Sequence, residues 1–205
     1  MNEGRVFIVT APSGAGKTSL IRDLLRREER LAISISHTTR PRRKGEVDGV
    51  DYYFVSPEEF ERINERDGFL ERAEVFDHLY GTSRAEVERL QGEGLDVILE
   101  IDWQGAQLVR QKMPEAVSIF ILPPSLAILE ARLRNRGTDD DGVISQRLAQ
   151  ARSDILHCQD FEHCVINDDF EGAVEQLRSL IQNPNQTDDN PRPCHERILG
   201  TSWFE

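Results

Sequence analysis

Short apolar runs alternate with amphipathic stretches along most of the chain. Apolar runs bounded by turn residues are typical of buried strands, and apolar spacings of three and four are typical of helices. The runs predict strands at Val6–Thr10, Ala32–Ser36, Leu95–Ile101, Val117–Leu122 and Cys164–Ile166. Helices are predicted at Thr18–Arg27, Trp103–Met113, Leu126–Asn135, Val143–Gln159 and Glu171–Ile181. Strands that alternate with helices indicate an α/β fold with a parallel sheet.

The segment from 37 to 92 interrupts this alternation and is predicted to be an insertion at the carboxyl edge of the sheet. It opens with the basic stretch His37–Gly49, whose glycine and proline are typical of an exposed loop. Strands are then predicted at Tyr52–Val55 and Phe69–Phe76. Ser56 and Ser83 each precede a glutamate by three residues, and such capping boxes predict that a helix follows each serine.

The first predicted strand runs directly into the glycine-rich stretch Ala11-Pro-Ser-Gly-Ala-Gly-Lys-Thr18. With few Cβ atoms in the way, successive backbone N–H groups can point at one polyphosphate, which also meets the positive end of the following helix. Lys17 is placed to reach the β- and γ-phosphates, and the Thr18 hydroxyl to hold Mg²⁺. The stretch therefore predicts a phosphate loop that binds a nucleotide.

Position 11 departs from the phosphate-loop pattern, which has glycine where this chain has Ala11. Gly14 and Gly16 stand where the backbone must curl around the phosphate. Residue 11 only leaves the strand, and Pro12 biases it toward an extended backbone. We therefore expect the loop to tolerate alanine at this position.

The charge of the chain restricts its partners. Its 205 residues suit one α/β domain, and its formal net charge is −12. Such a surface repels nucleic-acid phosphates, so we expect no nucleic-acid partner. No apolar run reaches the length of a membrane span, and the first residues lack the basic and apolar parts of a signal peptide. We expect a cytoplasmic protein with no membrane partner.

Basic residues nevertheless gather in two places in this acidic chain. One group is Arg40, Arg42, Arg43 and Lys44, and the other is Arg132, Arg134 and Arg136 with Arg147 beyond them. A charge run is often only a solvated surface, so the first group alone does not indicate a ligand. Two such groups together with a phosphate loop suggest two phosphorylated ligands and charge stabilisation between them, as phosphoryl transfer requires.

From about residue 5 to 182 the chain resembles the bacterial guanylate kinases. The stretches that carry the resemblance are APSGAGKTSL, SHTTRPRRKGEVDGVDYYFV, FLERAEVFDHLYGTS, EIDWQGA, FILPPS and VINDD. The resemblance implies a P-loop nucleoside monophosphate kinase fold, in which a parallel sheet core carries an inserted GMP-binding domain and a small lid. The expected core is about 1–36, 93–133 and 153–182, the insertion 37–92 and the lid 134–152. Residues 183–205 are polar and are predicted to be a disordered tail.

The resemblance also implies roles for individual residues. For GMP it implies Ser36, Arg40, Arg43, Tyr52 and Tyr80, and at the guanine base Glu71, Thr82 and Glu100. For ATP it implies Ser13, Gly14, Ala15, Gly16, Lys17, Thr18 and Ser19, with Asn167 near the adenine. The implied catalytic set is Lys17, Arg40, Arg132, Arg136 and Arg147. Mg²⁺ is expected on Thr18, and on Asp102 through a water.

The activity implied by the resemblance is direct, in-line transfer of phosphate from ATP to GMP, and also to dGMP, with release of ADP. Guanine presents N1–H and N2–H₂ donors side by side, which suit a carboxylate such as Glu71, whereas N1 of adenine is an acceptor. The alternative for Glu71 is an ordinary surface position in a strand. Because the phosphate of GMP is largely deprotonated at neutral pH, no general base is required.

Other functions stay open at this point. A P-loop kinase can act on another small phosphorylated acceptor, and a guanylate kinase-like domain can serve as a non-catalytic interaction module. A regulatory GTPase is disfavoured, because the chain has no Asn-Lys-x-Asp motif for reading guanine. The sequence does not fix the oligomeric state.

Overall fold

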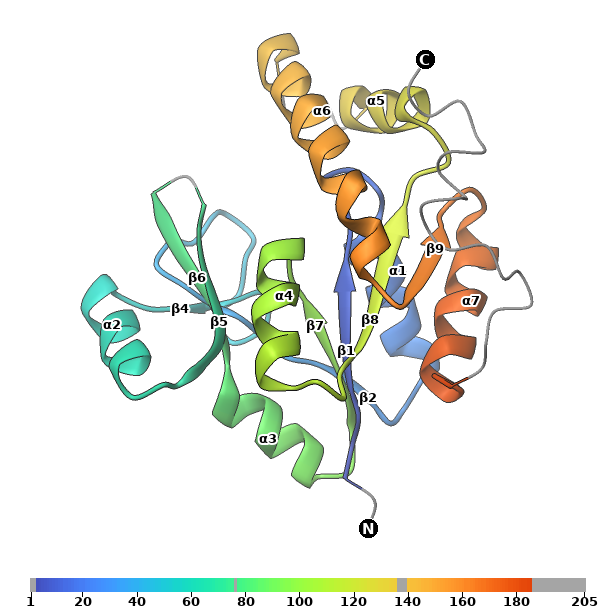
Figure 1. Ribbon diagram of the computed structural model, residues 1–205. Coiled ribbons are helices and arrows are strands. Elements are labelled where there is room, and N and C mark those ends of the chain that lie inside the picture. Colours follow the sequence, from blue (N-terminus) through green and yellow to red (C-terminus); the bar gives the residue numbers. More distant parts are fainter. Residues whose placement is uncertain (1–2, 76, 136–139, 186–205) are drawn as a thin grey trace. The chain divides into compact units, whose positions relative to one another are not determined.

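The computed structural model of the chain describes residues 3–75, 77–135 and 140–185 (Figure 1). The chain divides into two compact units. The first is Met1–Ile8 with Arg30–Ala116, and the second is Val9–Glu29 with Val117–Glu205. The division falls inside strand β1 (Val6–Thr10), whose five residues are all buried.

Five strands form one sheet in the order β2-β7-β1-β8-β9. The other four strands are β2 (Leu31–Ile33), β7 (Asp96–Glu100), β8 (Val117–Leu122) and β9 (His163–Ile166). The pair β2 and β7 is parallel, and so is the pair β8 and β9. Residues of β1 and β8 are almost wholly buried, as expected for parallel strands covered on both faces. The predicted α/β fold with a parallel sheet is confirmed.

A second sheet of four strands lies within the first unit, in the order β4-β3-β6-β5. Its strands are β3 (His37–Thr38), β4 (Tyr53–Phe54), β5 (Phe69–Val75) and β6 (His78–Ser83). Figure 1 shows β5 and β6 as a long antiparallel hairpin with helix α2 (Pro57–Glu65) beside it. Phe60 of α2 stacks on Phe69 of β5 with 4.5 Å between ring centroids, which ties the helix to the sheet.

The helices predicted to follow Ser56 and Ser83 are confirmed, and both serines cap them. The Ser56 hydroxyl accepts from the backbone N–H of Glu59 at the start of α2. The Ser83 hydroxyl accepts from that of Glu86 at the start of α3 (Arg84–Gly92). Helix α4 (Trp103–Lys112) follows β7, close to the predicted bounds.

The structure corrects three predictions in this part of the chain. The strand predicted at Ala32–Ser36 ends at Ile33, and the loop predicted at His37–Gly49 begins with β3. Strand β6 was not predicted at all. Tyr53 donates its N–H to Ser36 O and Val55 donates to Thr38 O, so tertiary pairing makes strands of polar residues. Such long-range strand pairing cannot be predicted from the pattern of hydrophobic residues.

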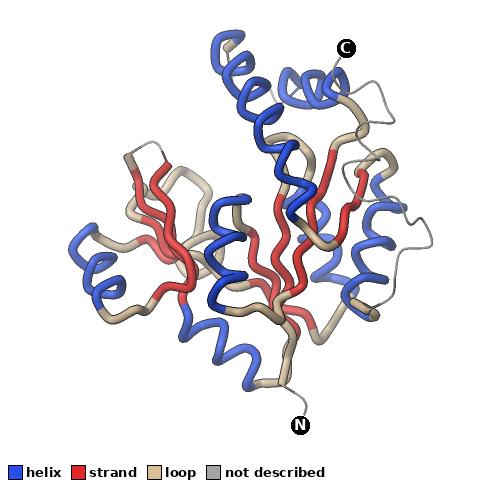
Figure 2. The backbone as a smooth tube through the Cα atoms, viewed as in Figure 1, coloured by secondary structure: helices blue, strands red, loops and turns tan. Residues whose placement is uncertain are grey.

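Two pairs of helices organise the second unit. Helices α1 (Lys17–Arg27) and α7 (Phe170–Gln182) lie side by side (Figure 2), and Arg27 bonds two glutamates of α7. Helices α5 (Leu126–Asn135) and α6 (Asp141–Leu156) pack through an apolar cluster. That cluster consists of Leu129, Leu133, Ile144 and Ala151. A 3₁₀ turn at His157–Asp160 replaces the last residues of the predicted helix.

Some predictions fall outside the described ranges. They concern residues 136–139 of the expected lid, which include Arg136, and residues 186–205 of the expected tail. The expected boundaries between core, insertion and lid therefore stay predictions. Within the described ranges, none of the helices combines the length and the apolar character that crossing a membrane takes.

Candidate functional site

A buried carboxylate lies between β5, β6 and α4 in the first unit. Glu71 of β5 is only 6% exposed, and Thr82 of β6 donates its hydroxyl to Glu71 Oε1 at 2.6 Å. A Cβ built on Gly105 of α4 lies 3.1 Å from Glu71 Oε2, so the missing side chain of this glycine makes room for the carboxylate. The alternative that Glu71 is an ordinary surface residue is therefore wrong.

Burial raises the pKa of the Glu71 carboxyl, and hydrogen bonding from Thr82 opposes that rise while the nearby charge of Asp102 adds to it. Asp102 accepts from the Gly105 N–H at 2.7 Å as the N-cap of α4. An ionised carboxylate has about four acceptor positions. Thr82 supplies only a hydroxyl and a backbone donor. The site therefore favours a ligand that presents N–H donors.

Arg40 and two tyrosines form a cationic corner of the same unit. The guanidinium of Arg40, which is 9% exposed, lies 5.5 Å from the ring centroid of Tyr52 and 5.8 Å from that of Phe54. The rings of Tyr52 and Tyr80 are 5.8 Å apart. Hydrogen bonds to Glu46 and to Tyr80 raise the pKa of Arg40, and burial opposes that rise. A buried cation flanked by hydroxyl groups suits a phosphate.

Glu46, for which no role was predicted, holds the cationic corner together. Its Oε1 pairs with Arg40 Nη2 at 2.7 Å, and its Oε2 accepts from the Arg43 backbone N–H at 2.8 Å. These hydrogen bonds, led by that of Arg40, lower the pKa of Glu46. The side chain of Arg43 is exposed. The sequence signal for this role of Glu46 was an acidic residue next to a run of basic residues.

The remaining residues predicted for GMP lie in this unit too. Ser36 is half-buried beside β4, where its carbonyl accepts from Tyr53. Glu100 ends β7, and its charge contributes, after burial and Tyr80, to the raised pKa of Tyr52. The first unit therefore brings Arg40, Tyr52 and Tyr80 into one electrostatic neighbourhood with Glu100.

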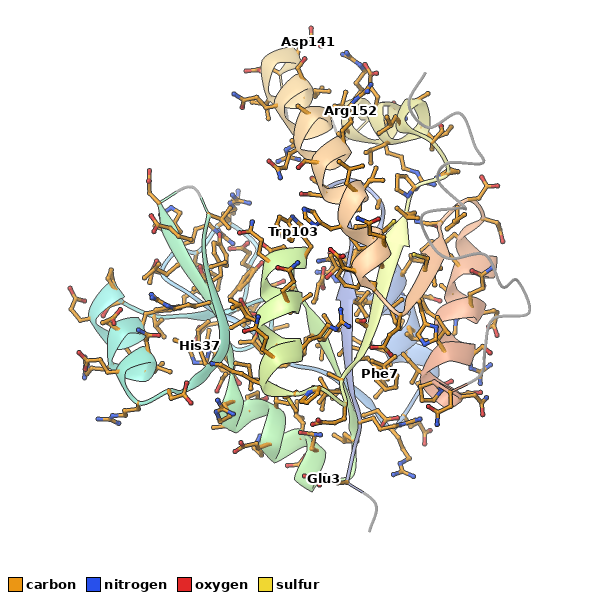
Figure 3. The ribbon with its side chains drawn as sticks, viewed as in Figure 1. Glu3, Phe7, His37, Trp103, Asp141 and Arg152 are labelled. Carbon is orange, nitrogen blue, oxygen red and sulfur yellow. The ribbon has the colours of Figure 1, made fainter. Side chains whose placement is uncertain are left out.

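His37 belongs to the packing of the four-stranded sheet (Figure 3). Its ring lies 4.9 Å from the Tyr53 ring and 5.6 Å from the Phe69 ring, measured between centroids. Burial lowers the pKa of His37, and its Nδ1 is buried without a hydrogen-bond partner. These contacts give His37 a structural role in the sheet.

The phosphate loop lies in the second unit. Gly14 and Gly16 have φ of 90° and 97°, in the left-handed region, while Ala11 is not among the described residues with positive φ. A Cβ on Gly14 lies 2.9 Å from Leu129 Cδ1, and one on Gly16 lies 2.4 Å from Asn167 Nδ2. Glycine is therefore needed at 14 and 16, and the interpretation that position 11 tolerates alanine is supported.

Helix α1 begins without a side-chain cap at Gly16. The other α-helices of the described ranges are capped by Ser56, Ser83, Asp102, Ser125, Asp140 and Asp169. Gly16 thus contributes no side-chain cap to α1, and a helix that starts after glycine is suited to an anion. Lys17 and Thr18 form the first turn, with Lys17 half-buried and Thr18 exposed.

Asn167, predicted for ATP binding, and Arg132, predicted to be catalytic, both bond the backbone of the loop. Asn167 donates its side-chain amide to Ala15 O at 2.7 Å, and Arg132 donates to the same oxygen at 3.4 Å. Arg147 is half-buried in α6. The structure therefore joins Asn167 and Arg132 to the phosphate loop, while Arg136 lies outside the described residues.

Replacing Ala11 by glycine tests this geometry. Because Ala11 does not need a left-handed backbone, we expect kcat and KM of Ala11→Gly to stay within about twofold of the wild type, with at most about 1 kcal/mol of stability lost to added chain entropy. Steady-state kinetics and thermal unfolding measure both. A large loss of activity would show that residue 11 shapes the phosphate site.

Comparison with known proteins identifies relatives over nearly the whole chain. The family model described as guanylate kinase matches residues 3–184. Guanylate kinase of Hahella chejuensis is 53% identical over 182 residues, which cover 89% of this chain and 88% of that protein. Guanylate kinase of Methylococcus capsulatus is 47% identical over 199 residues, which cover 97% of this chain and 98% of the relative.

A solved structure agrees with these relatives. The crystal structure of guanylate kinase from Anaplasma phagocytophilum has a TM-score of 0.73 and 31% identity, with 100% of this chain and 98% of that chain covered. The fold is thus that of the P-loop nucleoside monophosphate kinases. With the family match and these identities, the chain belongs to the guanylate kinase family.

Proposed function

We propose that the chain transfers the γ-phosphoryl group of ATP to GMP, giving GDP and ADP, with GMP bound by the first unit and ATP by the phosphate loop of the second. Family membership supports this activity over an unrelated acceptor or a non-catalytic module. The observation that carries the residue assignment is the buried Glu71 carboxylate, which shares a unit with the buried Arg40.

Glu71 selects guanine in this proposal. A carboxylate accepts hydrogen bonds from guanine N1–H and N2–H₂ together, whereas adenine offers an acceptor at N1 that repels it. Thr82 fixes the orientation of Glu71 through the 2.6 Å hydrogen bond. Glu100 is assigned to the base as well, and Ser36 to GMP. The phosphate of GMP is assigned to Arg40, Arg43, Tyr52 and Tyr80.

The chemistry then consists of alignment and neutralisation of charge. A phosphate monoester has a second pKa of about 6, so GMP attacks as the deprotonated phosphate and needs no general base. Lys17, Arg132, Arg136 and Arg147 are assigned to the charge of the transferring group, as phosphoryl transfer requires. Arg40, whose guanidinium is held by Glu46 at 2.7 Å, is assigned to hold the acceptor phosphate in place.

The donor set fits Mg²⁺ bound with ATP. Mg²⁺ takes oxygen ligands and keeps several waters, so one hydroxyl beside substrate phosphates suffices. Thr18 supplies a hydroxyl in the first turn of α1, next to the left-handed Gly16. Asp102 is assigned a contact through water, with the oxygen that does not cap α4. When bound, the ion neutralises phosphate charge and orients the polyphosphate.

One set of assays tests the proposed function. ADP production from ATP and Mg²⁺ is measured with GMP, dGMP, AMP, UMP and CMP as acceptors. We expect GMP to be the best acceptor and dGMP the next. A preference for another acceptor supports the alternative kinase, and nucleotide binding without turnover supports the interaction module. A cytoplasmic location and the lack of nucleic-acid partners stay predictions.

The raised pKa of Glu71 predicts an acid limit for GMP binding. Below that pKa the carboxyl is protonated and loses acceptor positions for guanine, so kcat/KM for GMP falls as the pH drops. The folded chain holds this proton at a higher pH than the unfolded chain, so Glu71 contributes more to stability as the pH falls. Lowering the pH is therefore expected to weaken GMP binding through Glu71 while it increases the contribution of Glu71 to stability.

GMP affinity measured by calorimetry between pH 4.5 and 8 checks this expectation. Ionisation of GMP itself affects the wild type and Glu71→Gln equally. The ratio of the two affinities at each pH therefore reports only the ionisation of the Glu71 carboxyl. We expect the ratio of wild-type to variant affinity to decline toward acid pH. A ratio that is independent of pH would contradict the assignment of Glu71 to the base.

A further inference from the structure

The backbone carbonyl of Ala15, inside the phosphate loop, is fixed by two side chains of the second unit. Asn167 Nδ2 donates to it at 2.7 Å, and Arg132 Nη1 donates to it at 3.4 Å. Arg132 Nη2 also donates to the backbone carbonyl of Asn167 at 2.9 Å. The three groups therefore form a closed set of hydrogen bonds, in which the loop carbonyl is the shared acceptor.

Asn167 is itself held firmly. It is 5% exposed, and its backbone N–H donates to Leu122 O at 2.8 Å, which continues the pairing of β8 and β9 by one residue. A Cβ built on Gly16 lies 2.4 Å from Asn167 Nδ2, so the amide packs against the loop as closely as glycine allows. Asn167 thus connects the end of β9 to the phosphate loop, through its backbone on one side and its amide on the other.

Because the Ala15 carbonyl is held in place, the orientation of the peptide between Ala15 and Gly16 is fixed as well. In a planar trans peptide the C=O and the following N–H point in opposite directions, and no cis peptide occurs among the described residues. Fixing Ala15 O toward Asn167 therefore aims the Gly16 N–H away from Asn167. A flipped peptide would instead turn a carbonyl oxygen toward a bound phosphate, which repels it.

We propose that Asn167 is a positioning residue of the phosphate loop, which holds the Ala15 carbonyl so that the Gly16 N–H points at the polyphosphate of the donor. Asn167 then sets the affinity for the phosphates, and not the recognition of adenine. This inference rests on the proposed function, in which the loop binds ATP. Arg132 supports the same carbonyl and links it to α5.

Inorganic tripolyphosphate separates the two roles, because it carries phosphates and no base. The variants are Asn167→Ala, which removes the donor, and Asn167→Asp, which keeps the size but turns an oxygen toward Ala15 O. Removing a buried hydrogen bond raises both KM for ATP and the competitive inhibition constant of tripolyphosphate by about tenfold in Asn167→Ala, and further in Asn167→Asp. KM for GMP stays within about twofold, because the acceptor does not use this loop.

Asn64→Asp is the matched control, because it adds the same charge in α2, where the amide bonds the Glu61 carboxylate. We expect it to leave both constants unchanged. Weaker ATP binding with unchanged tripolyphosphate binding would overturn the inference in favour of an adenine contact, and unchanged constants would overturn it as well. Wild-type affinity for GMP shows that a variant is folded. If Asn167→Asp does not fold, the result for Asn167→Ala decides the test. Wild-type protein that fails to bind tripolyphosphate would refute the proposed function of the loop instead.

Discussion

Lys17→Met is expected to lower kcat by about 10²-fold or more, because it removes a charge directed at the transferring phosphoryl group. Lys17 lies in the first turn of α1, directly after the left-handed Gly16. Methionine has nearly the same length and helix propensity, so the fold should persist. Affinity for GMP should also persist, since the residues assigned to GMP belong to the other unit.

Single-turnover kinetics with saturating ATP and GMP measure the chemical step, and calorimetry measures the affinity for GMP. Lys17→Arg is the control, because it keeps the charge but replaces a compact ammonium by a planar fork. We expect its rate to lie between those of the wild type and Lys17→Met. If Lys17→Met changed only KM for ATP, the lysine would serve binding alone and not the transition state.

Most of the parallel sheet could be predicted from sequence, because its strands are short and mostly apolar. The strand Val117–Leu122 has the predicted bounds, and β1 does as well. Covered on both faces, such strands need no alternation and depend little on distant partners for recognition. Helix starts were predictable for a local reason, since Ser56 and Ser83 contact residues only three positions away.

The four-stranded sheet was harder to predict, because its residues serve a ligand site as well as a core. In β6, His78–Ser83, Tyr80 and Thr82 replace the apolar residues that mark a half-buried strand. Strand β3 is two residues long and exists through pairing with β4 and β6. Tertiary hydrogen bonds therefore override local preference here, as is common where function competes with regular structure.

The candidate site was predictable where one short segment carries the chemistry. Gly14, Gly16 and Lys17 lie within four residues of one another, and the left-handed backbone of the two glycines belongs to the loop itself. By contrast, Asn167 reaches Ala15 across 152 residues, so sequence offered its residue type but not its partner. The close approach of Gly105 to Glu71 likewise depends on how α4 packs on β5. Long-range contacts of this kind cannot be read from spacing.

Glu71→Gln is expected to lower kcat/KM for GMP by roughly 10- to 100-fold, since a buried mispaired group costs about 1–3 kcal/mol and each 1.4 kcal/mol is about a factor of ten. Glutamine keeps one oxygen but places an NH₂ opposite a guanine donor. Activity on AMP should stay level or rise, because adenine N1 accepts a hydrogen bond from that NH₂. Measuring both acceptors in one coupled assay gives the change in preference directly.

The stability of the ligand-free protein shows whether Glu71 serves to bind the base or to stabilise the fold. Burial raises the pKa of Glu71, so the ionised carboxylate is unfavourable to folding at neutral pH, and the thermal midpoint of Glu71→Gln should hold or rise. Glu74→Gln, on the exposed side of the same strand, is the control and should change neither acceptor nor midpoint. Equal losses with GMP and AMP, or a lower midpoint with unchanged GMP activity, would assign Glu71 to the fold. A loss confined to GMP, with stability kept, would show that this buried carboxylate is retained for the base despite its desolvation.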